Sequence, residues 1–200
     1  MLGSGGCMER VVKGLFMMAL PAALLSGCLS SAPPPPKSWV VSASRSANAE
    51  LMIDRVVRLG SITVVAPYDK SALTVKRKDG SVAFDAYNVF ASSPSALLRA
   101  PLAALIEDDG RLGRVLASSS SVRTQSMLEA VVTDLSLDCR EEGKRIAKVA
   151  ISIAVIENRE IKMFLDGTGS ADAASGDYSA AFSDAFSKAV SEAMKGLRGK

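Results

Sequence analysis

The stretch VVTDLSLDC, residues 131–139, decides the fold. Its residues alternate between one set that contains Leu135 and Leu137 and a second set that contains the carboxylates Asp134 and Asp138. A period of two is typical of a β-strand, and carboxylates on one side predict that this side of the strand is in water. The same alternation places Val131 and Thr133 with the leucines on the buried side.

Two further alternating runs follow this strand. Polar turns at 141–144 and 157–158 separate the runs 147–156 and 159–170 from their neighbours. Alternate apolar residues define the inward side of both runs: Val149, Ile151, Ile153 and Val155 in the first, and Ile161, Met163 and Leu165 in the second. The pattern predicts a three-stranded antiparallel meander.

The region before this meander predicts more strands. Residues 38–41 and the β-branched run 55–65 each fit a strand. Residues 73–78 and 81–86 flank Asp79 and Gly80, a pair favoured in tight hairpin turns. A hairpin is therefore predicted for this segment.

Two helices complete the predicted fold. The first follows Ser93 with Pro94 at its first position and ends at Gly110, and Pro101 predicts a kink or a second start inside it. The second spans 178–197 and repeats a small and a large apolar residue every four positions. Its alanines predict close packing on a sheet, with a docking face for a partner as the alternative. We expect one α+β domain, with two main helices on an antiparallel or mixed sheet.

The N-terminus has the features of a secretory signal. Arg10 and Lys13 precede an apolar run, 14–25, which is shorter than the roughly 20 residues that span a bilayer. The run ends in Leu25-Ser26-Gly27-Cys28, which resembles the lipobox of bacterial lipoproteins. That resemblance implies signal-peptidase recognition of Leu25, Ser26 and Gly27, and acylation of Cys28 as the mature first residue.

Four consecutive prolines, 33–36, follow the acylated position. Such runs favour extended polyproline II and behave as semi-rigid spacers. The expected organisation is a signal peptide at 1–27, a tether at 28–38 and a periplasmic domain at 39–200. Leu29 and Ser30 are not the aspartate that retains lipoproteins in the inner membrane of enteric bacteria, so we expect the outer membrane, facing the periplasm.

Composition argues against several function classes. The formal net charge of +3 is too balanced to favour nucleic acid as a partner. The chain has no histidine, the residue most used as a general base and as a transition-metal ligand. Cys139 is the one cysteine beyond position 28, and its strand position predicts a small buried apolar residue.

Candidate chemical motifs each have a simpler explanation. The serine run 118–121 lacks a base and a glycine-flanked elbow. The acidic run 107–109 fits a solvated helix end better than a cation site. Asp134 with Asp138 fits a solvated strand face better than an acid–base pair, and the basic run 76–78 fits a solvated hairpin better than a headgroup contact. The segment DGTGSAD, 166–172, lacks the lysine of a phosphate loop. We therefore predict no enzyme, no metal site and no cofactor.

The sequence over 39–197 resembles the ABC-type transport auxiliary lipoproteins, the family of the lipoprotein in the paraquat-inducible intermembrane transport system. Three segments carry the resemblance: FDAYNVFASSPSALLRAPLAALIEDDGRLGRVLASSS (84–120), LEAVVTDLSLDCREEGKRIAKVAISIAVIENR (128–159) and DYSAAFSDAFSKAVSEAMKGL (177–197). Phe90 departs from the family, in which tryptophan is common at this place.

The resemblance implies a non-catalytic docking or adaptor module of a phospholipid transport system. Its expected partners are the membrane that holds its lipid anchor, Mce-domain and ABC-transporter subunits, phospholipid, and copies of itself, with no nucleic acid. Two alternatives stay open: a carrier that itself binds a lipid, and a lipoprotein activator of a cell-wall synthase.

Overall fold

The computed structural model describes residues 33–43 and 55–199, and the side chains among them up to Leu197. The chain divides into the units Met1–Pro35 and Pro36–Lys200. Of the first unit only residues 33–35 are described, and they are exposed without regular secondary structure. The fold belongs to the second unit.

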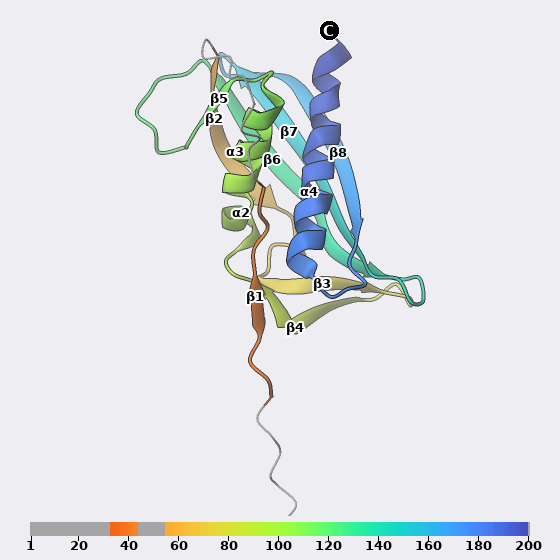
Figure 1. Cartoon of the computed structure of the whole chain (residues 1–200). Coiled ribbons are helices and arrows are strands. Elements are labelled where there is room, and N and C mark those ends of the chain that lie inside the picture. Colours follow the sequence, from red (N-terminus) through yellow and green to blue (C-terminus); the bar gives the residue numbers. More distant parts are fainter. Residues whose placement is uncertain (1–32, 44–54, 200) are drawn as a thin grey trace, which may run out of the picture. The chain divides into compact units, whose positions relative to one another are not determined.

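A mixed sheet of eight strands forms the body of this unit (Figure 1). Its strands are β1 (Lys37–Trp39), β2 (Val56–Val64), β3 (Ala72–Arg77), β4 (Val82–Phe90), β5 (Arg114–Leu116), β6 (Ser126–Cys139), β7 (Ile146–Glu157) and β8 (Glu160–Asp172). The predicted hairpin (β3, β4) and meander (β6, β7, β8) are confirmed, whereas β5 was not predicted.

Strand β6 organises the sheet. It pairs with β7 antiparallel along its whole length, and β7 pairs with β8 in the same way. On its other side, β6 pairs parallel with β2 in its first half and with β3 in its second half. The β1–β4 and β2–β5 pairs are also parallel, so the sheet is mixed. The chain enters this unit at β1, beside the half of the sheet that contains β3 and β4.

The three α-helices of the described residues lie on one side of the sheet (Figure 1). They are α2 (Pro94–Leu97), α3 (Arg99–Asp109) and α4 (Tyr178–Lys195), and a 3-10 turn, Gly196–Gly199, follows α4. The break at Leu98 confirms the second start that Pro101 predicts, because Pro101 lies in the first turn of α3, where no helical partner for its nitrogen is needed. Gly110 ends α3 in the left-handed conformation, with φ of 79°.

Helix α4 packs very closely on β8. Its N-cap Asp177 accepts a hydrogen bond from the backbone N–H of Ala180. The buried alanines of the helix, at 181, 185, 189 and 193, form the stripe on the sheet side. A Cβ atom placed on Gly167 or Gly169 would lie 2.0 Å from the carbonyl oxygen of Ala189 or Ala185. The predicted close packing of the alanine stripe is confirmed, and the glycines of segment 166–172 serve this contact.

Two bulges correct the predicted sides of the strands. A register shift between Val132 and Asp134 puts Val132 and Leu135 on the helix side, so the assignment of Val131 and Thr133 to the buried side was wrong. A second shift lies between Val155 and Ile156. The inward assignment of Ile161 was also wrong.

In the ranges described above, no helix is both long enough and apolar enough to cross a membrane.

Candidate interaction face of the sheet

The side of the sheet away from the helices, here called the open face, carries the candidate site. On the helix side, β6, β7 and β8 present residues such as Leu135, Val149 and Gly169, which pack under α4. The intervening residues of the same strands project to the open face, because successive side chains alternate. Their cross-strand partners follow from the pairing register and divide the open face into two patches.

The charged patch occupies the half of the open face beside β3. It consists of Lys76, Asp134, Ser136, Asp138, Arg140 and Lys148. Lys76 Nζ donates to Asp134 Oδ2 at 2.6 Å, and Ser136 Oγ donates to Asp134 Oδ1 at 2.6 Å. Burial lowers the pKa of Lys76, but hydrogen bonds from its ammonium to Asp134 and Tyr68 outweigh this effect and raise the pKa overall.

Asp138 is the most buried carboxylate of this patch, with 8% of its side chain exposed. Its two oxygens accept from Arg140, and Lys148 Nζ lies 2.7 Å from Oδ2. The Arg140 hydrogen bonds hold the pKa of Asp138 well below its usual value; burial opposes this effect and Lys148 adds to it. Both cationic partners are more exposed than Asp138 itself, so the patch is neutralised at its solvent side.

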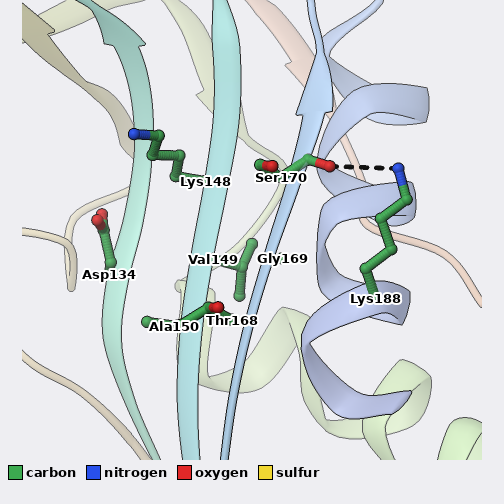
Figure 2. A pocket seen from close by; sticks show the side chains of 8 residues that line it. All are labelled: Asp134, Lys148, Val149, Ala150, Thr168, Gly169, Ser170 and Lys188. Atoms are coloured by element: carbon green, nitrogen blue, oxygen red, sulfur yellow. Dashed lines mark hydrogen bonds between the residues drawn. The ribbon is translucent and has the colours of Figure 1, made fainter. Parts of the chain in front are cut away.

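An open pocket of about 550 Å³ adjoins the charged patch (Figure 2). It extends across β6, β7 and β8 and includes Asp134, Lys148, Thr168 and Ser170. Lys188 reaches the edge of β8 from α4 and donates to the carbonyl oxygen of Ser170 at 3.2 Å. Because this bond occupies an outward-facing backbone group, Lys188 shields part of the β8 edge.

The apolar patch occupies the other half of the open face. Three rows of cross-strand neighbours form it: Met127, Ile156 and Ile161; Glu129, Ala154 and Phe164; and Val131, Ser152 and Asp166. The side chains of Ile161 and Phe164 are 57% and 61% exposed. Exposed large apolar groups that are contiguous on a rigid sheet are typical of an interaction surface.

A fixed loop borders the apolar patch. Arg58, which pairs in register with Met127, donates from its guanidinium to the carbonyl oxygens of Ser118, Ser120 and Val122. The serine run therefore supplies backbone acceptors that hold the loop between β5 and β6. Within the described residues, none of its serines has the surroundings of a nucleophile.

Other sequence candidates have structural partners. Asp109 binds Arg111 through two hydrogen bonds of 2.6 Å, and Glu107 accepts from the backbone N–H of Val115. The acidic run thus fixes the end of α3. Lys78, in the basic run, pairs with Glu142 at 3.2 Å.

The interpretation of Asp134 and Asp138 as a solvated face was wrong in one respect. They do share the open face, but Asp138 and Ser136 are buried. Cations from β3 and β7 cover the carboxylates, and Thr74, which pairs in register with Ser136, is buried beneath the segment at Pro67.

The remaining predictions concern the lone cysteine of the domain, a metal site and the lipobox. Cys139 is a free thiol of intermediate exposure, and burial raises its pKa. Among the residues that the structure describes, no group of acidic, cysteine or histidine side chains could hold a metal ion. The lipobox residues Leu25, Ser26, Gly27 and Cys28 lie outside the described residues.

Sequence reasoning missed the residues that distinguish the two patches. Lys148 and Lys76 are separated in sequence from the carboxylates that they bind, and only the strand register brings them together. The exposed Phe164 was a detectable signal, since it alternates with Met163 and Leu165, which were assigned inward.

Comparisons with known proteins give the fold. No family model matches the sequence, and no curated protein matches it. A crystal structure of a Xanthomonas campestris protein, described under the family model DUF330, matches with a TM-score of 0.58 and 15% identity, over 82% of this chain and 92% of that chain. The crystal structure of an uncharacterized protein matches with a TM-score of 0.55 and 11% identity, over 82% and 96% of the two chains.

The likeness is one of architecture. Both matches cover nearly the whole of the solved chains and 82% of this chain, so these proteins share its fold.

Proposed function

We propose that this chain is a membrane-anchored accessory protein of an intermembrane lipid transport system, and that it acts by docking and not by catalysis. The docking part of this proposal is supported by the open face. It combines exposed apolar groups with a rigid sheet whose other side is already covered by helices. A surface of this kind is suited to another protein.

The lipid-transport part of the proposal is supported by two agreeing likenesses. The sequence pattern over 39–197 resembles the ABC-type transport auxiliary lipoproteins, and the fold matches a DUF330 structure over 82% of the chain. An acylated Cys28 followed by a proline spacer would hold the domain near a membrane, where Mce-domain and ABC-transporter subunits are the proposed partners.

Affinity purification of the full-length chain from mildly solubilised membranes tests this proposal. We expect mass spectrometry of the retained material to identify Mce-domain and ABC-transporter subunits. Recovery of a cell-wall synthase without transport subunits would overturn the proposal. A stoichiometric lipid without any protein partner would instead favour the carrier alternative.

The matched control is Cys28→Ala, which removes the thiol that would be acylated and leaves the domain sequence unchanged. We expect this variant to lose the anchored complex while its circular dichroism spectrum keeps the same strand and helix content. An unchanged complex in this variant would contradict the role of the anchor.

A further inference from the structure

The apolar patch differs from an ordinary strand surface because large apolar side chains of the described strands are exposed in it. Val131, Ile161 and Phe164 are all exposed, and they lie in three adjacent cross-strand rows. Elsewhere on the open face, the exposed Phe84 has the ammonium of Lys70 4.4 Å from its ring centroid. In the described part of the chain, Phe164 has no such contact.

The charges of the apolar patch are acidic and unpaired. Glu129 lies in the row of Phe164, and Asp166 lies in the row of Val131. Within the ranges that the structure describes, neither carboxylate forms an ion pair or a hydrogen bond. The guanidinium of Arg58, at the border of the patch, donates to loop carbonyl groups and, among the described contacts, to neither carboxylate.

In the charged patch of the same sheet, the carboxylates are neutralised by ion pairs. In the charged patch, Asp134 and Asp138 each have a lysine or arginine nitrogen within 2.7 Å. A patch with two free carboxylates around exposed apolar groups is complementary to apolar groups flanked by cations.

We infer that the apolar patch docks a basic amphipathic segment of a partner protein, such as a helix with an apolar stripe bordered by lysine or arginine. The inference deepens the proposed docking function and rests on it. An anionic membrane surface is disfavoured because Glu129 and Asp166 would repel its headgroups. A second copy placed face to face is disfavoured because it would present the same two carboxylates.

The position of the patch agrees with this choice. The chain enters the domain at β1, which pairs with β4 and so lies at the end of the sheet that holds β3. The apolar patch lies on the opposite half of β6, beside β2. Within the domain, β1 and the apolar patch therefore lie at different ends of the sheet.

A proximity cross-linking experiment with a defined probe tests the inference. The probe is a synthetic peptide of leucine and lysine patterned as an amphipathic helix, and a carbodiimide joins its lysine amines to carboxylates that it contacts. The full chain is used in neutral detergent micelles. We expect peptide mapping to find cross-links at Glu129 and Asp166 at roughly ten times the yield at Glu141 and Glu142, which lie in the β6–β7 turn and already have lysine partners.

Two variants sharpen this test. Phe164→Ser should lower the cross-linking yield at Glu129 about tenfold, because the apolar contact is lost. Glu141→Gln combined with Glu142→Gln removes the same kind of charge elsewhere and should leave the yield unchanged. Equal yields at all exposed carboxylates, or no effect of Phe164→Ser, would overturn the inference.

The affinity purification from membranes, combined with the peptide experiment, tells failure of this inference apart from failure of the proposed function. If the unmodified chain retains transport subunits and the Phe164→Ser variant retains them equally, the docking site is wrong while the function stands. If the peptide maps to the apolar patch but no transport subunit is recovered, the patch stands and the proposed function fails.

Discussion

The two patches of the open face both contain carboxylates, but in opposite states. Asp138 in the charged patch is buried and bound by Arg140 and Lys148, whereas Asp166 in the apolar patch is exposed without an ion partner in the described chain. Asp138 lies on β6 and Asp166 on β8, the two long strands on either side of β7 in one sheet. The difference shows that the type of a residue alone does not tell whether a carboxylate stabilises the fold or is available to bind a partner.

The neighbouring strands cause this difference. Strand β3 supplies Lys76 and β7 supplies Lys148 to the charged patch, while the positions of β7 in the apolar patch are Ser152, Ala154 and Ile156. A carboxylate beside small or apolar neighbours keeps its charge available for an incoming group. We therefore expect substitutions in the charged patch to change stability, and those in the apolar patch to change binding.

The largest effect is expected for Asp138→Ala. This change leaves Arg140 and Lys148 without their shared buried acceptor and should lower the free energy of unfolding by about 2 kcal/mol. Asp166→Ala is the matched control and should change it by less than about 0.5 kcal/mol. Urea denaturation at pH 7 measures both. Equal losses in the two variants would remove the distinction between the patches.

Arg58→Met should have the next largest effect. The methionine keeps an apolar stem but removes the donors to three loop carbonyls, so we expect a loss of about 1 kcal/mol and faster tryptic cleavage at Arg123. Arg77→Met, in β3, serves as the control. Unchanged cleavage at Arg123 would show that Arg58 does not hold the loop.

The charged patch should also be sensitive to acid. Because the pKa of Asp138 is lowered in the folded state, the folded chain binds fewer protons there than the unfolded chain. Its contribution is present above about pH 4 and is lost as the pH falls through the lower folded pKa. We expect the stability gap between the unmodified chain and Asp138→Asn to narrow below about pH 4 in urea titrations. A gap that stays constant from neutral to acid pH would contradict this assignment.

The smallest effect on stability is expected for Phe164→Ser. Its ring is largely in water already, so unfolding should change by less than about 0.5 kcal/mol, and binding of a hydrophobic dye should fall. Phe84→Ser, the matched change in the other half, should cost about 1 kcal/mol because the Lys70 contact is lost. A larger loss for Phe164→Ser than for Phe84→Ser would mean that Phe164 serves the fold.

Much of the fold could be predicted from local patterns. The alternation in β7, the turn at Asp79 and Gly80, and the end of α3 at Gly110 are all encoded within a few residues. The apolar stripe of α4 also predicted which side of this helix packs on the sheet. These predictions were correct because turn chemistry and periodicity depend on residues that are close together in the sequence.

The sides of β6 and β8 could not be predicted, because one bulge reverses the alternation beyond it. The parallel pairs of β6 with β2 and β3 depend on contacts between distant segments. The composition of the two patches depends on both the bulges and these long-range pairings, so it could not be predicted either. Lys76 and Asp134, for example, are 58 residues apart, and no local pattern indicates their contact.

The glycines of β8 also limit where the domain could accommodate a hydrocarbon chain. At Gly167 and Gly169 the space between strand and helix is too narrow even for a methyl group, because the carbonyl oxygens of Ala189 and Ala185 already occupy it. An acyl chain could not be inserted there unless α4 separated from the sheet. Any lipid that this domain handles with its fold intact must therefore remain outside this helix–sheet seam.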